Sequence, residues 1–326
     1  MLEGKKILIT GGAGFIGSNL AEYFLRNNQV TVLDNFSTGH MHNLAEHMDN
    51  FDFQLIEGDI RNLEDCKKAC EGMDIILHQA ALGSVPRSIN DPITTNQVNI
   101  DGFLNMLVAA NESSVLRFVY AASSSTYGDS KILPKTEDNI GAPLSPYAVT
   151  KYVNELYASV FSNLYDLEII GLRYFNVFGR RQDPNGAYAA AIPKFISSFL
   201  DLKSPIVHGD GSQTRDFTYI QNVIQANELA AETTNPEAFN QVYNVAFGER
   251  TVLLDLIKKI QSLLSQINPA IGKVDIRFGP ERIGDVKHSL ASIDKAKRIL
   301  GYNPSHSVAK GLDEAIEWYY KELTAK

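Results

Sequence analysis

A phenol and an ammonium lie four residues apart in SPYAVTK, residues 145–151, as Tyr147 and Lys151. Four residues is about one turn of an α-helix, so the two side chains would share a face if the segment is helical. The pKa of a tyrosine hydroxyl is about 10, so it is inert as a base at neutral pH, but a neighbouring cation favours the phenolate. The spacing therefore predicts a general base, Tyr147, activated by Lys151.

The surrounding residues favour a helix at this pair. The Ser-Pro that opens the segment is typical of a helix start, and the following run YVNELYASVFSNLY has apolar residues at helical spacing. Tyr127 and Lys131 in YGDSK have the same separation, but the Gly-Asp between them breaks a helix. Only the first pair is therefore predicted to share a face.

Short apolar segments alternate with helical patterns through the first half of the chain. Strands are predicted at residues 6–10, 30–34, 53–59, 75–80, 116–123 and 167–174, with helices between them such as 15–28 and 94–112. Strands that are almost continuously apolar are covered on both faces, so this order predicts an α/β fold with a Rossmann-type, doubly wound parallel sheet.

The pattern is looser from about residue 177 onward. Helices are predicted at residues 189–200, 223–232, 253–266 and 310–323, and short strands at 204–209, 242–246 and 274–278. We expect a smaller mixed α/β lobe packed over the carboxyl edge of the sheet, where ligands bind in such folds.

A glycine motif follows the first predicted strand and opens the first helix, with Gly11, Gly14 and Gly17. A turn in this place lets backbone N–H groups and a helix N-terminus face a pyrophosphate. Asp34 ends the second strand, about where the dinucleotide fingerprint has its acidic residue. Its carboxylate would accept hydrogen bonds from ribose hydroxyls and repel a 2′-phosphate, so the sequence predicts NAD rather than NADP.

Three consecutive serines, Ser123, Ser124 and Ser125, follow the fifth strand at the same predicted edge. One of them could hold a substrate hydroxyl while Tyr147 removes its proton. Lys151 would lower the pKa of the phenol and hold the nicotinamide ribose. The sequence thus predicts oxidation of an alcohol beside a nicotinamide.

Composition argues against several other classes of protein. The 326 residues carry a formal net charge of −8 without a basic stripe, which argues against a nucleic-acid partner. Cys66 and Cys70, at helical spacing, are interpreted as reduced thiols, and His40 and His42 lack the further ligands that a metal site needs. No apolar run approaches the roughly 20 residues of a membrane span, and the start is no signal peptide, so we expect a soluble cytoplasmic protein without a metal.

Along nearly its whole length the chain resembles the extended short-chain dehydrogenase/reductase family. The motifs that carry the resemblance are TGGAGFIGSNL, VLDNFSTG, GDIRN, HQAA, SSSTYG, YAVTK and LRYFNVFGRRQDP. It implies an NAD-dependent enzyme that acts on a nucleotide sugar. Residues 1–176, together with 217–247, would bind NAD, and the lobe at 177–326 would bind the sugar nucleotide. A homodimer is implied through the helices near 90–112 and 146–164.

The resemblance also assigns site residues. The catalytic residues would be Ser123, Tyr147 and Lys151. Tyr147 and Lys151 would also contact NAD, together with Gly11, Gly14, Phe15, Ile16, Gly17, Asp34, Asn35, Ser37, Thr38, Gly39, Asp59, Ile60, Gln79, Ala80, Ala81, Asn99, Tyr174 and Val177. The substrate would meet Ser123 and Tyr147, together with Gly83, Ser84, Ser124, Asn176, Gln182, Ala190, Arg215, Arg282, Asp285 and Ser289. Asn176 and the two arginines are expected on the diphosphate.

Members of this family share oxidation at carbon 4 and differ in the later steps. The 4,6-dehydratases carry an Asp–Glu pair where this chain has Ser124 and Ser125, which cannot act as acid and base. Epimerisation needs no further acid or base, because the ketone only has to present its other face to the hydride. We therefore expect a 4-epimerase rather than a dehydratase.

Within the family the chain most resembles bacterial UDP-N-acetylglucosamine 4-epimerases. Epimerases restricted to UDP-glucose and UDP-galactose carry a tyrosine four residues after the aspartate that matches Asp285, and this chain has Ser289. A small residue there leaves room for an acetamido group, so interconversion of UDP-N-acetylglucosamine and UDP-N-acetylgalactosamine is predicted. The alternatives are a UDP-glucose/UDP-galactose or UDP-hexuronic acid 4-epimerase, or a catalytically silent NAD-binding protein on the same fold, against which the intact Ser123, Tyr147 and Lys151 argue.

Overall fold

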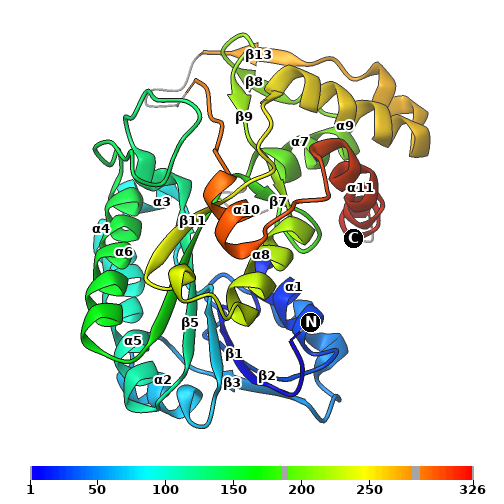
Figure 1. Ribbon diagram of the computed structural model, residues 1–326. Coiled ribbons are helices and arrows are strands. Elements are labelled where there is room, and N and C mark those ends of the chain that lie inside the picture. The colour runs from blue at the N-terminus through cyan, green and yellow to red at the C-terminus, as the bar shows by residue number, and fades with distance from the viewer. Residues whose placement is uncertain (1, 185–189, 281–286, 325–326) are drawn as a thin grey trace.

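The computed structural model describes residues 2–184, 190–280 and 287–324, and its centre is one parallel sheet (Figure 1). The seven strands lie in the order β11-β6-β5-β4-β1-β2-β3, and every neighbouring pair is parallel. Their bounds are β1 Lys6–Thr10, β2 Gln29–Asp34, β3 Phe53–Glu57, β4 Ile75–His78, β5 Arg117–Ser123, β6 Glu168–Tyr174 and β11 Gln241–Val245. The predicted Rossmann-type parallel sheet is confirmed.

Helices cover both faces of this sheet. One face packs against α1 (Phe15–Phe24) and α8 (Ile220–Glu232), and the other against α2 (Leu63–Cys70), α5 (Gly102–Glu112) and α6 (Pro146–Leu164). Side chains alternate between the faces along a strand, so Ile7 and Ile9 of β1 join one buried cluster while Leu8 joins the other.

The helix predicted at residues 94–112 has more than one part. The chain forms α3 (Val85–Asn90) and α4 (Pro92–Asn96), then a π-helical turn at Gln97–Asp101 that leads into α5. Short 3₁₀ turns lie at Met41–Asn43, Ala45–His47, Ser124–Tyr127, Pro236–Ala238 and Pro269–Lys273.

A smaller lobe of short strand pairs and helices lies beyond the carboxyl edge of the sheet (Figure 1). Its helices are α7 (Ala191–Leu200), α9 (Leu253–Ile267) and α11 (Val308–Thr324), with α10 (Asp294–Leu300) against β11. The strand pairs are β7 (Val177–Phe178) with β10 (Thr218–Tyr219), β9 (Thr214–Arg215) with β12 (Thr251–Val252), and β8 (Ile206–His208) with β13 (Arg277–Gly279). The smaller mixed lobe predicted from the sequence is therefore present.

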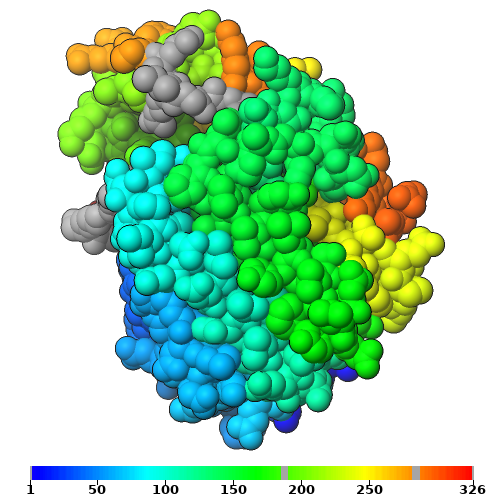
Figure 2. Space-filling model, turned by 90° about the vertical axis from the view of Figure 1, so that its left-hand side faces the viewer, coloured from blue at the N-terminus to red at the C-terminus, as the bar shows by residue number. Residues whose placement is uncertain are grey.

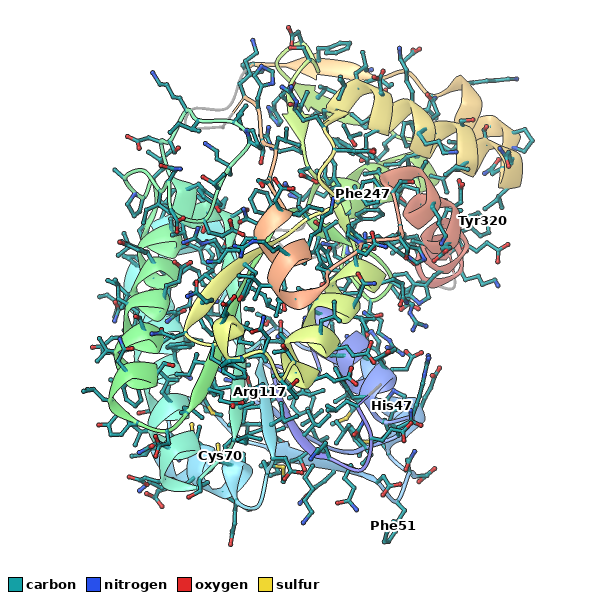
Figure 3. All side chains as sticks on the ribbon, in the orientation of Figure 1. His47, Phe51, Cys70, Arg117, Phe247 and Tyr320 are labelled. Atoms are coloured by element: carbon teal, nitrogen blue, oxygen red, sulfur yellow. The ribbon has the colours of Figure 1, made fainter. Side chains whose placement is uncertain are left out.

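Both cysteines are buried free thiols in α2. Figure 3 shows Cys70 at the end of the molecule opposite to the lobe. Within the described ranges, no helix is long and apolar enough to cross a membrane, and no group of three histidine, cysteine or acidic side chains could hold a metal ion.

Candidate active site

The close approach of α1 to the ends of β1 and β4 requires glycine at positions 11 and 17. Gly11 has a φ of +68°, and a Cβ there would lie 2.8 Å from the backbone N and Cα of Ala80. A Cβ on Gly17 would lie 2.2 Å from the carbonyl oxygen of Gly11. That oxygen accepts a hydrogen bond from the N–H of Gly14 at 3.1 Å. The missing side chains let the N-terminus of α1 come close to the ends of β1 and β4.

This turn lines a cavity of about 370 Å³ at the carboxyl edge of the sheet. Of the residues predicted to bind NAD, the cavity is lined by Gly11, Gly14, Phe15, Ile16, Gly17, Asp34, Asn35, Ser37, Thr38, Gly39, Asp59, Ile60, Gln79, Ala80 and Ala81. Gly83, predicted at the sugar, lines this cavity too, as does Arg87, which the sequence analysis did not single out.

Asp34 presents a buried carboxylate at the end of β2. Its Oδ2 accepts a hydrogen bond from the N–H of Ala13 at 2.9 Å, and its Oδ1 accepts one from the N–H of Phe36 at 2.8 Å. Burial raises the pKa of this carboxyl group, and the backbone hydrogen bonds oppose that rise. The side chain is thus fixed in the cavity wall, with lone pairs left to accept hydroxyl donors.

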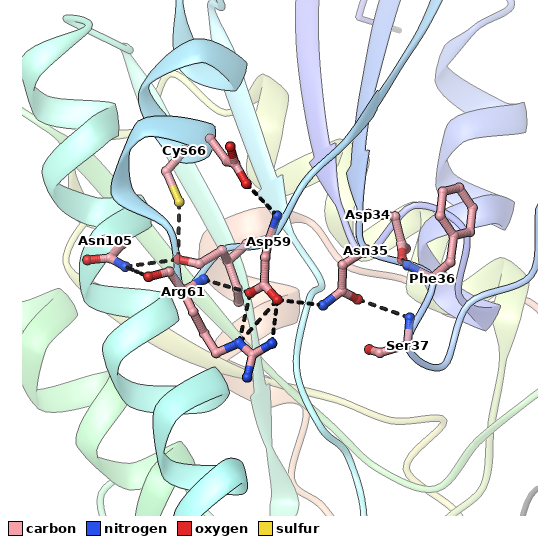
Figure 4. Close-up of polar contacts among 10 residues, drawn as sticks. Asp34, Asn35, Phe36, Ser37, Asp59, Arg61, Cys66 and Asn105 are labelled. Atoms are coloured by element: carbon pink, nitrogen blue, oxygen red, sulfur yellow. Dashed lines mark hydrogen bonds and ion pairs between the residues drawn. The ribbon is translucent and has the colours of Figure 1, made fainter.

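A second carboxylate, Asp59, is fixed farther along the wall (Figure 4). Arg61 donates to it through Nε and Nη2, with Nη2 at 2.6 Å from Oδ2, and Asn35 Nδ2 donates at 2.8 Å. The hydrogen bond from Arg61, supported by one from Asn35, lowers the pKa of Asp59 to about 2. Asp59 therefore stays ionised at neutral pH.

Ser123, Tyr147 and Lys151 come from β5 and the first turns of α6. Ser145 caps α6 by accepting from the N–H of Ala148 at 3.1 Å, so both members of the predicted pair lie on one helix. Ser123 Oγ accepts from the N–H of Ser125 at 3.1 Å and from Ser125 Oγ at 2.9 Å. The Ser123 hydroxyl also shares a hydrogen bond with the side chain of Tyr147.

Burial dominates the titration of the Tyr147 and Lys151 pair. Desolvation raises the pKa of Tyr147, and a hydrogen bond with Ser123 opposes the rise. Desolvation lowers the pKa of Lys151 to about 8, and its Nζ donates to the carbonyl of Ala121 at 2.8 Å. The sequence predicted that Lys151 lowers the pKa of Tyr147, but in this structure burial raises that pKa, and the group that opposes the rise is Ser123.

Asn99 holds the sheet edge against α6. Its Oδ1 accepts from the N–H of Leu82 at 2.8 Å, while its Nδ2 donates to the carbonyl of Leu82 at 3.2 Å and to Thr150 Oγ1 at 3.1 Å. Thr150 Oγ1 donates in turn to the carbonyl of Tyr147 at 2.8 Å. The Asn99 amide therefore links the end of β4 to the helix turn that carries Tyr147, and its contact with NAD stays a prediction.

Two further cavities meet at Asn176 and Arg215, which line both. The first, of about 600 Å³, lies in the lobe and is also lined by Lys194, Lys203 and His208, which the sequence analysis missed. The second, of about 570 Å³, brings together Ser123, Ser124, Asn176, Arg215 and Ser289 from the predicted substrate set. We call the second one the sugar cavity.

The remaining predicted residues lie around these cavities. Ser84 caps α3 by accepting from the N–H of Arg87 at 3.2 Å, and Ala190 is the exposed N-cap of α7. Gln182 Nε2 donates to the carbonyl of Val177 at 3.0 Å. The hydroxyl of Tyr174 lies 3.2 Å from Gln79 Oε1 and accepts from Asn227 Nδ2 at 2.9 Å. Arg282 and Asp285 lie outside the described residues.

Known proteins resemble this chain over almost its whole length. A model of the NAD dependent epimerase/dehydratase family matches residues 7–246. A putative UDP-glucose 4-epimerase of Methanocaldococcus jannaschii is 35% identical over 315 residues, which cover 96% of this chain and 97% of that relative.

Two solved structures combine a similar fold with sequence identity above 30%. The UDP-N-acetylglucosamine 4-epimerase from Methanobrevibacter ruminantium M1, in complex with UDP-N-acetylmuramic acid, is 37% identical with a TM-score of 0.92, and the match covers 98% of this chain and 100% of that one. The UDP-glucuronic acid 4-epimerase from Bacillus cereus, in complex with UDP-glucuronic acid and NAD, is 33% identical with a TM-score of 0.87, and the match covers 97% of this chain and 99% of that one.

The protein therefore belongs to the NAD-dependent epimerase/dehydratase family, and the predicted resemblance to extended short-chain dehydrogenases is confirmed. Its cofactor is NAD. The glycine turn fits a pyrophosphate, because Gly11 and Gly17 leave no room for a Cβ. The buried Asp34 in the same cavity fits a ribose diol.

Proposed function

We propose that the protein is a UDP-sugar 4-epimerase that interconverts UDP-N-acetylglucosamine and UDP-N-acetylgalactosamine. Residues 1–176 with 217–247 bind NAD in this proposal, and the lobe formed by the rest of 177–326 binds the nucleotide sugar. The observation that carries the choice of sugar is the small side chain of Ser289 in the wall of the sugar cavity.

The proposed chemistry needs one base and one hydrogen-bond donor at oxygen 4 of the sugar. Ser123 donates a hydrogen bond to that oxygen, and Tyr147 takes the hydroxyl proton and later returns it. Lys151, where protonated, adds a positive charge that favours the phenolate. When bound, NAD supplies the acceptor for the hydride of carbon 4 and gives the hydride back. The result is inversion at carbon 4 without net oxidation.

The cavity has the properties that this sequence of steps requires. Its volume of about 570 Å³ leaves a hexose room to turn between the two hydride transfers. Ser124 and Ser125 line it where a dehydratase carries an acid and a base, and a serine hydroxyl cannot take either role in the elimination of water. Asn176 and Arg215, at the junction with the lobe cavity, are suited to hold the diphosphate while the sugar moves.

Ser289 is held in the wall by its backbone. Its N–H donates to the carbonyl of Thr214 at 3.1 Å, and that strand continues into Arg215. The side chain is therefore fixed relative to the residue proposed for the diphosphate. A serine in this position leaves room for an acetamido group, and the similar proteins include a UDP-N-acetylglucosamine 4-epimerase as well as a putative UDP-glucose 4-epimerase.

The test is kinetic efficiency on N-acetylated and plain UDP-sugars, without added cofactor, for the wild-type protein and Ser289→Tyr. Overpacking by the added ring costs about 1–3 kcal/mol, so kcat/KM for the N-acetylated pair should fall roughly 5- to 150-fold while that for UDP-glucose and UDP-galactose is spared. Ser262→Tyr, on the exposed side of α9, is the control for the same substitution away from the cavity. A wild-type preference for plain sugars, or an equal loss on both pairs, would refute the choice of sugar.

We also propose a homodimer through α4 and α6. Leu156, Val160 and Leu164 on α6 are 51%, 51% and 68% exposed, and Ile93 on α4 is 71% exposed. The segments that contain α4 and α6 lie side by side on one face of the molecule, in cyan and green (Figure 2). An apolar stripe of this kind favours burial against a second copy. Sedimentation should give a dimer that Leu156→Glu converts to monomer.

A further inference from the structure

A buried lysine in the sugar cavity has no part in the proposed reaction. Lys135 is 5% exposed and lines the cavity together with Ser123 and Ser289. Its backbone is fixed on both sides, since its N–H donates to the carbonyl of Leu290 at 2.8 Å and its carbonyl accepts from the N–H of Ser292 at 2.8 Å. The lysine is therefore held in the cavity wall by the segment that also carries Ser289.

The ammonium of Lys135 has few partners within the protein. Its Nζ donates to the carbonyl of Ser130. In the described part of the chain, no carboxylate lies within ion-pair distance of it. An ammonium has three N–H donors, so one carbonyl leaves it incompletely satisfied. Burial lowers the pKa of Lys135, as desolvation does for a cation without a compensating charge.

A second buried cation shows what a compensated charge looks like in the same protein. Arg173, 3% exposed, is held by Glu155 through Nε at 2.9 Å and Nη2 at 2.7 Å. It also donates to the carbonyl of Glu137 at 2.8 Å. Buried charges are normally paired in this way because desolvation is costly. The different surroundings of Lys135 indicate a cation that is completed by a ligand.

The position of Lys135 indicates which part of a UDP-sugar it would meet. Asn176 and Arg215 line both large cavities, so the diphosphate that they are proposed to hold lies at the junction. Lys135 lines only the sugar cavity. This placement puts Lys135 nearer to the proposed hexose than to the proposed diphosphate. Val85 and Ile89 of α3 form an apolar part of the wall, and Lys135 adds a cation to the one that Arg215 provides at the junction.

We propose that Lys135 is a specificity-determining residue that binds a carboxylate carried by the hexose of a UDP-sugar. This rests on the proposed function, because it places the hexose of a UDP-sugar in the sugar cavity. The ligand class is UDP-sugars with an acidic group, either as carbon 6 itself or on an ether substituent of the ring. A carboxylate accepts several charge-assisted hydrogen bonds and neutralises the buried ammonium.

The test uses ligand pairs that differ by the acidic group. UDP-glucuronic acid is compared with UDP-glucose, and UDP-N-acetylmuramic acid with UDP-N-acetylglucosamine, by calorimetric binding to the NAD-loaded protein. Lys135→Met keeps the length of the side chain and removes the charge, and Lys135→Gln is a second neutral variant. Lys131→Met is the matched control, because Lys131 is exposed in the same loop.

At least one acidic ligand should bind the wild-type protein and lose affinity roughly ten- to a hundredfold in Lys135→Met, the effect of removing one charge-assisted hydrogen bond. Its neutral counterpart should change less than about threefold, and Lys131→Met should match the wild type. The proposal is overturned if neither acidic ligand binds, if the variants bind both members of a pair with the same loss, or if nothing changes. Thermal unfolding of the variants verifies that they are folded.

The binding measurements test the carboxylate subsite, and epimerisation assays test the proposed function, so the two can fail separately. Failure of every UDP-sugar to be epimerised would refute the proposed function, while a Lys135-dependent preference for an acidic ligand would still stand. Epimerisation together with binding that is indifferent to Lys135 would refute only the carboxylate subsite.

Discussion

Substitution of Gly17 by alanine tests whether the turn before α1 is the pyrophosphate site. The new Cβ would lie 2.2 Å from the carbonyl oxygen of Gly11 and 2.7 Å from the Cα of Gly12, both backbone atoms that cannot rotate away. Relief of the contact requires a displacement of roughly 1 Å in the turn or in α1. Because the Gly11 oxygen also accepts the N–H of Gly14, this displacement disturbs the hydrogen bond that closes the turn.

Overpacking of this kind costs about 1–3 kcal/mol. If the displaced groups are those that face the pyrophosphate, the loss appears in NAD affinity as a roughly 5- to 150-fold rise in Kd. The measurements are the NAD content of the purified protein and the Kd for NAD after the protein has been stripped of it. Circular dichroism verifies that the variant keeps its helices.

Gly272→Ala is the matched control. A Cβ on Gly272 would meet only Ser265 Cβ, at 3.5 Å, which is an ordinary contact. This variant should retain NAD like the wild type. A folded Gly17→Ala protein whose Kd for NAD is within about twofold of the wild-type value would refute the assignment of the turn to the pyrophosphate.

Three further predictions concern the catalytic and cofactor groups. Tyr147→Phe should keep the fold and NAD but lose about 10²–10⁴ in turnover, because the phenol oxygen is the proposed base; near wild-type turnover would contradict that role. Asp34→Ala should weaken NAD binding by about 1.5–3 kcal/mol and reduce the preference over NADP, both measured by titration; an unchanged preference would remove Asp34 from the ribose. Because burial lowers the pKa of Lys151 to about 8 from 10.5, the ammonium loses its proton at a lower pH in the folded state than in the unfolded state. Stability of the wild type relative to Lys151→Met should therefore rise between about pH 8 and 10.5, in thermal unfolding, while kcat/KM falls above about pH 8 as the charge is lost. Parallel pH profiles of the two proteins would exclude the shift.

Most strands of the central sheet could be predicted because both of their faces are buried, whereas the edge strand β3 is only partly buried. Residues 7–9 and 75–77, for example, are continuous apolar runs, and the sheet follows from the alternation of such segments with helices. The pairs β7 with β10 and β9 with β12 were not predicted. Each strand has two residues, too few for any periodicity, and the partner lies far away along the chain.

The site residues likewise divide into those with a local sequence signal and those placed by contacts between distant segments. The glycine turn and Asp34 have a local signal, because both follow predicted strands. Lys135 was missed since its neighbours in LPKTEDN are typical of an exposed loop, and its burial depends on pairing with residues 290–292. Asn99 was predicted at the cofactor, but its hydrogen bonds to Leu82 and Thr150 were not predicted. They join three segments that only the tertiary fold brings together.

The origin of β11 limits how this enzyme can be taken apart or recombined. The strand that pairs with β6 comes from residues 241–245, after much of the lobe has been traversed, and α8 just before it covers the sheet near β5 and β6. A fragment that stops at residue 176 would leave the edge of β6 open and one face of the sheet partly bare, a surface prone to aggregation. Exchange of sugar specificity between relatives would therefore have to replace the segments on either side of 217–247 while keeping that stretch, so that the recombined protein inherits an intact sheet.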